Sequence, residues 1–473
     1  MEKTLGAKEF AEEVQAGSIS ALEHASKIVE EIEKKNPHYH HFNCFEKDFV
    51  LDQARALEKE IKKGRKGKLL GVPVSVKDCL CVKGLESRAG SKVLGGYRPV
   101  FDATAVAKAK AEGAIILGKS VQDEFGFGTF SVNVGAGEIP LNPIDTSRSC
   151  GGSSGGAAGF AALTEHTHIA MAESTGGSIA APASFCGMAS ITPTYGLVSR
   201  YGLMDYANSL DKIGAIGKSV EDAWLLLSVM AGKDPMESTT IDSPPLVAQG
   251  VKGLRIGIPF ELMESISDKK IKEACLAKIS RAQEIGAKVI DVKLPLNTQY
   301  GLAAYYIIAM SEASTNLAKY CGMRYGLQKK LEGNFNEYFS AVRSEGFGEE
   351  AKRRILIGTF ARMSGFRDAY YMRAMKVRSL LIKEFRKVFS KTDLLTFPAM
   401  PMAAPTFSQI EKLTPLQHYS ADLCTVPANL CGLPHATVNA GLANGLPAGL
   451  MVCANHLDDA RALSFAHALE ALQ

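Results

Sequence analysis

The sequence predicts an α/β protein in which layers of helices cover a β-sheet. Its 473 residues are enough for one large domain or for two to three smaller ones. A hydrophobic content of 46% and a charged content of 22% are those of an ordinary globular protein. Short apolar runs also alternate with helical patterns along the chain, which is the arrangement expected of layered α/β folds.

Charge, cysteine content and hydropathy exclude several classes of function. The net charge is only +4, without long charge runs, so electrostatics do not require direct nucleic-acid binding. The ten cysteines form no CxxC pair and follow no signal peptide, which indicates reduced intracellular thiols. No apolar run reaches the about 18 residues of a membrane helix. We therefore expect a soluble cytoplasmic enzyme without membrane contact.

The N-terminal part is predicted to be helical. Amphipathic patterns indicate helices over residues 8–15, 21–35 and 49–63, and Pro37 is expected to end the second. The histidine-rich segment 38–41 follows this proline. Its histidines lack the i,i+4 spacing of helical metal ligands, so a polar loop is the better interpretation than a metal site.

Two motifs in the next part of the chain match known patterns in residue type but not in structural context. A strand is expected at 69–77, a helix at 105–112 and a strand at 114–117. Residues 113–120 match the phosphate-loop pattern GxxxxGK[ST], but the variable residues form the strand and a helix precedes it, so we reject nucleotide binding. Residues 151–155 match the GxSxG nucleophile elbow, but the polar loop 141–148 stands where that elbow needs a buried strand.

The alternation continues to the C-terminus. The predicted helices are 222–231, 268–285 and 368–388, and the predicted strands are 254–259, 288–292 and 394–398. The region 303–354 is expected to be mainly helical, and 421–472 to contain a helix, two strands and a closing helix. No internal repeat or low-complexity linker marks a domain boundary.

Two glycine-flanked serine clusters, at 151–156 and 175–178, carry the candidate chemistry. Glycine lets the backbone approach a reacting group, so one loop can supply a nucleophile and the other a proton relay. A serine hydroxyl needs a nearby base, and no histidine has the spacing of a triad. Lys77, at the end of the apolar run 69–77, is the candidate base because burial favours a neutral amine. The alternative is a lysine at a strand end that extends into solvent.

Together, four stretches of the chain resemble the amidase signature family: 71–78, 151–156, 175–179 and 182–187. The resemblance implies an α/β fold with a large mixed central sheet covered by helices on both faces. It also implies a Ser–cis-Ser–Lys triad, with Ser178 as nucleophile, Lys77 as base and Ser153, at a cis peptide, passing the proton between them. The implied oxyanion hole consists of the backbone N–H groups of Thr175, Gly176, Gly177 and Ser178.

Within this family the chain is most similar to the glutaminase (A) subunits of tRNA-dependent amidotransferases. The similar stretches are 193–203, 208–214, 234–239, 304–309, 312–317, 343–348, 352–355 and 368–371. The similarity implies one domain over 1–473. Its parts are an N-terminal helical segment (1–65), a core carrying the triad (66–230) and a remainder with the substrate pocket (231–473).

This similarity implies hydrolysis of glutamine to glutamate and ammonia, with no cofactor in this chain. The B component uses the ammonia, ATP and Mg²⁺ to amidate Glu-tRNA(Gln) or Asp-tRNA(Asn). The tRNA is contacted mainly through this component, and the A, B and C components form a heterotrimer. The implied glutamine pocket contains Tyr305, Arg354 and Asp422, with Tyr306 and Arg353 as alternatives one residue away. An aspartate and an arginine suit the ammonium and carboxylate groups of an amino acid.

Two positions depart from the family's usual pattern. Ser174 replaces a usual aspartate and Ala180 a usual arginine; the loss of both members of a pair leaves no buried charge alone. The spacing of the two serines is also one residue longer than usual, near 164–168. Two other functions therefore stay open: a stand-alone amidase for another small amide, and a weak component that serves as a scaffold. Asp123 and Glu124 can line the site or cap local structure.

Overall fold

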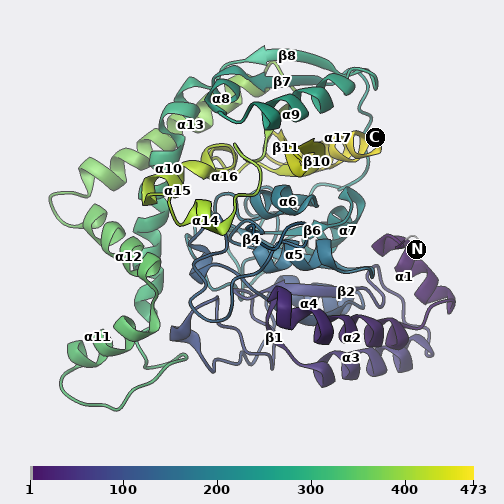
Figure 1. Cartoon of the computed structure of the whole chain (residues 1–473), viewed down its shortest axis with the longest axis vertical. Coiled ribbons are helices and arrows are strands. Elements are labelled where there is room, and N and C mark those ends of the chain that lie inside the picture. Colours follow the sequence, from purple (N-terminus) through teal and green to yellow (C-terminus); the bar gives the residue numbers. More distant parts are fainter. Residues whose placement is uncertain (1–3, 473) are drawn as a thin grey trace.

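A mixed eleven-stranded sheet runs through the computed structural model, which describes residues 4–472 (Figure 1). The strand order is β1-β3-β2-β4-β6-β5-β10-β11-β9-β7-β8. The strands are β1 (Phe42–Phe45), β2 (Pro73–Lys77), β3 (Ile115–Ser120), β4 (Ile169–Ser174), β5 (Ala189–Thr192), β6 (Lys212–Gly217), β7 (Arg255–Pro259), β8 (Lys288–Val292), β9 (Leu394–Pro398), β10 (His435–Ala443) and β11 (Leu446–Ala454).

Parallel pairs lie toward both ends of this sheet and antiparallel pairs join them. Strand β2 is parallel to β3 and β4, and β7 is parallel to β8 and β9. The antiparallel hairpin of β10 and β11 turns at Asn444-Gly445, where both residues have positive φ (53° and 80°). Asn-Gly is the pair that a two-residue hairpin turn of this kind prefers.

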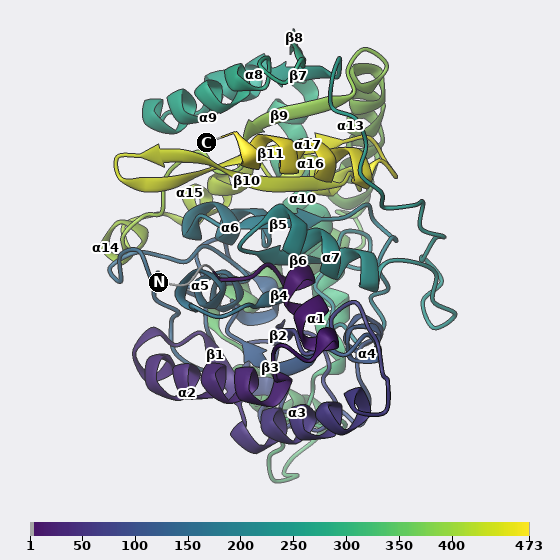
Figure 2. The ribbon, with the colours of Figure 1, turned by 90° about the vertical axis from the view of Figure 1, so that its right-hand side faces the viewer.

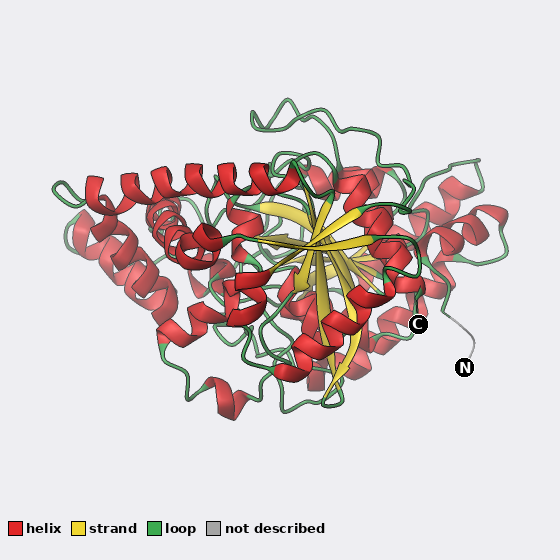
Figure 3. Ribbon diagram, turned by 90° about the horizontal axis from the view of Figure 1, so that it is seen from above, coloured by secondary structure: helices red, strands yellow, loops and turns green. Residues whose placement is uncertain are grey.

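Helices cover both faces of the sheet, as Figure 3 shows from above. They are α1 (Ala7–Ala16), α2 (Ala21–Tyr39), α3 (Lys47–Ile61), α4 (Thr104–Ala111), α5 (Gly155–Leu163), α6 (Ala180–Cys186), α7 (Val220–Met230), α8 (Phe260–Ser265), α9 (Lys269–Arg281), α10 (Pro295–Asn316), α11 (Phe335–Gly346), α12 (Glu349–Arg362), α13 (Arg373–Phe389), α14 (Phe407–Ile410), α15 (Pro415–Ser420), α16 (Val426–Leu430) and α17 (Asp459–Ala471). The predicted α/β class, a mixed central sheet between helices, is confirmed.

The middle strands are covered on both sides, and this places the core. Every residue of β2, β3, β4, β5, β6 and β9 is buried. Such strands are mostly apolar because neither face meets water. Polar groups inside them therefore need partners within the protein. Among the described residues 4–472, none of the helices has the length and apolar character to cross a bilayer.

The N-terminal segment differs from its prediction in two ways. It is not only helical, since β1 pairs with β3 at one edge of the sheet, beside α2 and α3 (Figure 2). Pro37 also does not end α2, which continues to Tyr39. Proline lacks an N–H group, but in the last turn it removes only one helical hydrogen bond. The side chain of Asn36 bonds both the N–H and the C=O of Phe42 and so fixes the chain that follows the helix.

The segment after Pro37 is not the predicted polar loop either. His41 is buried and one ring nitrogen lies 2.9 Å from the carbonyl oxygen of Leu141, so burial lowers its pKa to about 4. A buried neutral imidazole packs as part of the core. Residues 4–472 contain no group of three or more His, Cys, Asp or Glu side chains placed to hold a metal ion.

Two strand boundaries also differ from the prediction. Strand β2 begins at Pro73, because the chain turns at Gly71 (φ +76°). Strand β3 continues to Ser120 and includes Lys119. The buried Nζ of Lys119 lies 3.2 Å from the backbone carbonyl oxygen of Asp78 and also bonds the carbonyl of Leu80. A lysine enclosed within a strand does not form a phosphate loop, in agreement with our rejection of that motif.

Candidate active site

The sheet brings two ionisable residues to the same edge. Strands β2 and β4 are parallel, with Val76 opposite Met171, so Lys77 and Glu173 both lie near the C-terminal ends of their strands. Carboxyl ends of parallel strands form one edge of a sheet, where α/β proteins usually hold their ligands. Both side chains are buried, with exposed fractions of 0% and 4%.

Lys77 points into the protein and not into solvent. Its Nζ lies 2.8 Å from Ser153 Oγ, 2.8 Å from the carbonyl oxygen of Glu173 and 2.8 Å from Glu173 Oε2. The alternative of a solvent-exposed lysine at a strand end is therefore wrong. The amine is desolvated, and its contacts join it directly to the serine and to a carboxyl group.

Ser153 lies in a tightly packed loop that precedes α5. The Gly152–Ser153 peptide is cis and Ser153 is fully buried. A Cβ atom on Gly152 would lie 2.2 Å from Asp123 Oδ2 and 2.7 Å from the backbone nitrogen of Ser131. Only glycine fits there, which is the close backbone approach expected of this loop.

Ser178 lies in the loop between β4 and α6, five residues after Glu173, which contacts Lys77. Its exposed fraction is 6%, and its hydroxyl has no hydrogen-bond partner among residues 4–472. Lys77 and Ser153 are thus joined directly, whereas Ser153 and Ser178 are not hydrogen-bonded to each other. The side chain that would attack a substrate is the one that keeps its hydroxyl unpaired.

The backbone of the same loop presents unpaired donors. Within the described part of the chain, the N–H groups of Gly176, Gly177 and Ser178 find no acceptor. A Cβ on Gly176 would lie 2.8 Å from Tyr305 Oη, and one on Gly177 would lie 2.4 Å from Thr425 Oγ1, so both positions need glycine. Asn429 fixes the loop by donating to the carbonyl of Thr175. Fixed N–H groups of this kind can stabilise a developing oxyanion.

Arg354, on α12, is buried among aromatic rings. Its Nε donates to Glu350 Oε1 over 2.8 Å, and its Nη1 donates to Tyr206 Oη over 2.6 Å. The side chain of Arg353 pairs with the same glutamate but is 42% exposed. Of the two register alternatives, Arg354 is therefore the one that faces the interior. Its guanidinium lies 5.0 to 5.6 Å from the ring centres of Phe127, Tyr206, Tyr306 and Tyr419.

Asp422 faces the same interior region. Tyr306 Oη donates to its Oδ2 over 2.5 Å, and Thr129 Oγ1 donates to its Oδ1 over 2.9 Å. Burial raises the pKa of Asp422 above its usual range. Both tyrosines of the register alternative lie here, because Tyr306 holds Asp422 while Tyr305 packs against Gly176.

A cavity of about 220 Å³ leads from the surface to Arg354 and to Thr129, which contacts Asp422. Its lining includes Arg354, Thr129 and Tyr419, together with Gly128, Asn133, Glu350, Arg353, Leu413, Pro415 and His418. A larger hollow of about 770 Å³ lies beside the N-terminal helices and 164–166, and none of the predicted site residues lines it. The smaller cavity is therefore the candidate substrate entrance.

Two acidic residues near Lys77 were missed in the sequence. Glu173 contacts Lys77, and its Oε1 lies 2.9 Å from Thr175 Oγ1. The same hydroxyl oxygen lies 2.7 Å from Asp211 Oδ1. Burial and the nearby charge of Glu173 raise the pKa of Asp211 well above its usual range. The available signal was a glutamate directly after the apolar run 169–172.

The positions that depart from the family pattern carry no stranded charge. Ser174 donates to the carbonyl of Gly176 over 3.1 Å, and Ala180 is fully buried. The residue before Ser174 is an acid, Glu173, and it points toward Lys77.

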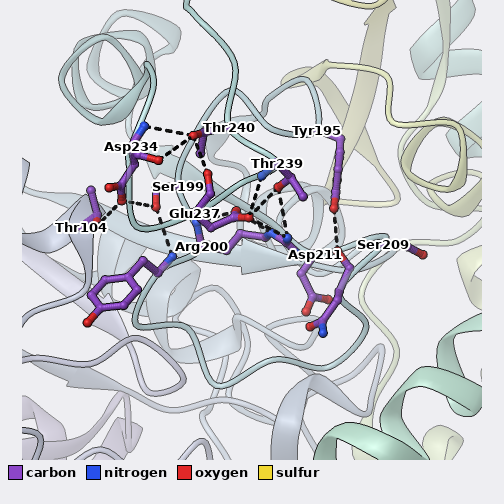
Figure 4. Close-up of polar contacts among 12 residues, drawn as sticks. Thr104, Tyr195, Ser199, Arg200, Ser209, Asp211, Asp234, Glu237, Thr239 and Thr240 are labelled. Carbon is purple, nitrogen blue, oxygen red and sulfur yellow. Dashed lines mark hydrogen bonds and ion pairs between the residues drawn. The ribbon is translucent and has the colours of Figure 1, made fainter.

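A polar network fixes the loop that carries Asp211 (Figure 4). Arg200 donates to Glu237 from Nε and Nη2, over 3.1 and 3.2 Å. Asp234 accepts from Ser199 and Thr104, each over 2.6 Å. These contacts hold the segment 199–200 of this loop on the segment 234–240.

Comparison with known proteins places this geometry among amidases. The family model described as Amidase matches residues 23–463. The A subunit of glutamyl-tRNA(Gln) amidotransferase from Archaeoglobus fulgidus is 44% identical over 457 residues, covering 97% of this chain and 96% of its own. The protein of the same name from Thermoanaerobacter pseudethanolicus is 42% identical over 469 residues, covering 98% and 95%.

Solved structures give the same picture. The A subunit of glutamyl-tRNA(Gln) amidotransferase from Thermotoga maritima has a TM-score of 0.78 at 34% identity, covering 95% of this chain and 91% of its own. The peptide amidase of Stenotrophomonas maltophilia has a TM-score of 0.83 at 26% identity, covering 99% and 96%.

Proposed function

The chain belongs to the amidase signature family, and from this membership we propose that it is the glutamine-hydrolysing component of a tRNA-dependent amidotransferase. The observation that carries the proposal is the link between two groups of residues through Thr129, whose carbonyl oxygen accepts from the N–H of Gly152 over 2.7 Å and whose Oγ1 donates to Asp422 over 2.9 Å. One group is the buried contact between Lys77 and Ser153, and the other is the pocket of Arg354 and Asp422. The names of the relatives from Archaeoglobus fulgidus and Thermotoga maritima support the same function.

In the proposed reaction, Ser178 is the nucleophile. Its oxygen attacks the side-chain amide carbon of glutamine, while its proton passes through Ser153 to the amine of Lys77. The N–H groups of Gly176 and Gly177 donate to the developing oxyanion. The proton then moves to the leaving nitrogen, ammonia departs, and water hydrolyses the acyl-enzyme by the same relay.

The pocket suits a free amino acid. Arg354 keeps its positive charge at any physiological pH and can donate two parallel hydrogen bonds to an α-carboxylate. Asp422 can accept from the α-ammonium, and Tyr306 fixes its orientation. An amidase for a simple amide would have no use for this pair of charges, so the pocket favours glutamine.

The ammonia is proposed to serve a partner. We propose that a B component activates the carboxylate of the misacylated tRNA with ATP and Mg²⁺ and accepts the ammonia there, and that a C component completes a heterotrimer. In this proposal the tRNA contacts mainly the B component. The names of the relatives, which specify one lettered component of an amidotransferase, are what support these partners.

Ammonia release from glutamine tests the proposal. The chain is assayed alone and with candidate B and C components, with and without ATP and glutamyl-tRNA. Release that rises with partners, ATP and acylated tRNA, and that is lost in Lys77→Ala, is the expected result. Equal turnover of simple amides without partners, with glutamine no better than the others, would make the chain a free-standing amidase.

Neighbouring arginines provide a matched control for the pocket. Arg354→Lys keeps the charge but loses the planar fork, so we expect a higher KM for glutamine. Arg353→Ala removes a side chain that is 42% exposed and lines the outer cavity without bonding to Tyr206, so its effect on KM is expected to be smaller than that of Arg354→Lys. A KM that responds equally to both changes would contradict the assigned register.

A further inference from the structure

The side chain of Glu173 connects the amine of Lys77 to a second carboxyl group. Its Oε2 lies 2.8 Å from Lys77 Nζ, and its Oε1 lies 2.9 Å from Thr175 Oγ1. The hydroxyl of Thr175 in turn lies 2.7 Å from Asp211 Oδ1. All four side chains are buried, so each proton in this chain of contacts must be accounted for within the protein.

The hydroxyl of Thr175 fixes the number of protons. A threonine hydroxyl has a single hydrogen and can donate it to only one of the two carboxyl oxygens beside it. The other short contact then needs a hydrogen from a carboxyl group. One of the two acids, Glu173 or Asp211, is therefore protonated.

Backbone donors around Asp211 stabilise its carboxylate form, against the burial that raises its pKa. Its oxygens lie 2.9 Å from the N–H nitrogen of Tyr206 and 3.0 and 3.1 Å from that of Ala207. Backbone donors stabilise the charged form of an acid, as does the positive charge of the nearby Arg200. Burial and the charge of Glu173 act in the opposite direction, but the second effect vanishes once Glu173 is protonated. By contrast, Glu173 Oε1 has a single hydrogen-bond partner among residues 4–472, the hydroxyl of Thr175.

The contacts of Lys77 agree with a proton on Glu173. A neutral amine has two hydrogens and one lone pair. The two hydrogens can go to the carbonyl oxygen and to Oε2 of Glu173, and the lone pair can accept from the Ser153 hydroxyl. A charged ammonium would donate to all three, and Ser153 could then pass no proton to it. Transfer of one proton from Lys77 Nζ to Glu173 Oε1 leaves the total charge of the group unchanged.

We propose that Glu173 is a positioning residue that holds the proton given up by Lys77, so that the lysine faces Ser153 as a neutral amine. Glu173 donates to Thr175, and Thr175 donates to the carboxylate of Asp211. The use of the amine in catalysis rests on the proposed function. The place of the proton does not, and can be measured by itself.

Isotope-edited infrared spectroscopy of the whole chain measures it directly. A protonated carboxyl has a carbonyl stretch well above the bands of a carboxylate, and ¹³C in the glutamate carboxyl shifts only glutamate bands. Spectra are recorded above the pKa of about 7 that burial gives Glu124, where Asp123, with a pKa of about 6, is also ionised. The expected result is a protonated glutamate band that disappears in Glu173→Gln and persists in Asp211→Asn.

Two further variants distinguish this role from a purely structural one. Thr175→Val removes the acceptor of the carboxyl proton, so the same band is expected to shift. Glu173→Ala is expected to lower kcat/KM for amide hydrolysis about tenfold to a hundredfold. Glu173→Gln should recover most of this loss, because its amide imitates the protonated acid: it can donate to Thr175 and accept from Lys77.

The contrary results are equally definite. Absence of a protonated glutamate band, or a band that moves only with labelled aspartate and vanishes in Asp211→Asn, would overturn the proposal. A Glu173→Gln variant as slow as Glu173→Ala would do the same. If the wild type hydrolyses no amide at all, the proposed function fails, while the spectrum still decides where the proton lies.

Discussion

Glu124 offers a sharp test of the electrostatics of this fold. It is 3% exposed, and burial raises its pKa from 4.5 to about 7. Its Oε1 lies 2.5 Å from Ser91 Oγ, and its Oε2 accepts from the N–H of Gly348 over 2.9 Å. Ser91 Oγ is also 3.2 Å from the carbonyl oxygen of Gly346. If the serine donates to that carbonyl, a protonated Glu124 donates to the serine, and glutamine can replace it with the same contacts.

The direction in which stability changes with pH follows from the raised pKa of Glu124. Between pH 4.5 and about 7 the folded chain binds this proton more tightly than the unfolded chain, so the free energy of unfolding falls as pH rises. The stabilisation is complete below the unfolded value and is lost through the folded one. At about 1.4 kcal/mol per pH unit, the total is about 3 kcal/mol. Roughly 2–3 kcal/mol of this falls between about pH 5 and about pH 8.

Glu124→Gln should remove this loss of stability at higher pH, because the glutamine side chain does not ionise. We expect the difference in unfolding free energy between variant and wild type, measured with guanidinium, to favour the variant by roughly 2–3 kcal/mol more at about pH 8 than at about pH 5. Glu237→Gln is the matched control. Burial of Glu237 is outweighed by its bonds with Arg200, so its pKa is lowered and the difference should hardly change over this range. An equal difference for Glu124→Gln at both pH values would refute the reasoning.

Four further substitutions test the site and the packing that supports it. Ser153→Ala should lower glutamine hydrolysis about 10²–10⁴-fold at unchanged thermal stability, and wild-type rates would exclude a relay through this serine. Asp422→Asn should lower kcat/KM for glutamine about tenfold to a hundredfold, as expected for a lost bond to a charged group. Tyr306→Phe should lower it less. Wild-type kinetics in both variants would contradict the assignment of these residues to the glutamine pocket. Gly358→Ala puts a Cβ 1.8 Å from the carbonyl oxygen of Met310, so urea unfolding should show about 1–3 kcal/mol less stability, and an unchanged value would count against this packing.

Much of the fold could be predicted because local pattern and burial agree. The strands at 288–292 and 394–398 have the predicted bounds: the second is a fully buried apolar run, and the first is an edge strand in which three of five residues are β-branched. Strand β3 was predicted too short because Lys119 looks like a loop residue. In the structure its ammonium finds oxygen partners inside the protein, and these come from residues about 40 positions away in the sequence.

The candidate site was predictable where glycine patterns mark it and less so elsewhere. Lys77 and Ser153 belong to recognisable motifs, and the structure brings them together. Sequence could not choose between Arg353 and Arg354, because α12 has no clear apolar stripe that would say which face is buried. Glu173 was missed because its meaning depends on Asp211, which another strand and loop bring to it.

The division of the site along the chain has a consequence for biosynthesis. The lysine and both serines lie before residue 180, whereas Arg354 and Asp422 come from the second half, and Thr129 meets Asp422 across 293 positions. Long-range contacts of this kind form late, because a large loop must close first. A nascent chain emerging from the ribosome would thus have its reactive hydroxyls before it had any means to retain glutamine. The pocket that selects glutamine is thus completed only after the catalytic residues have been synthesised.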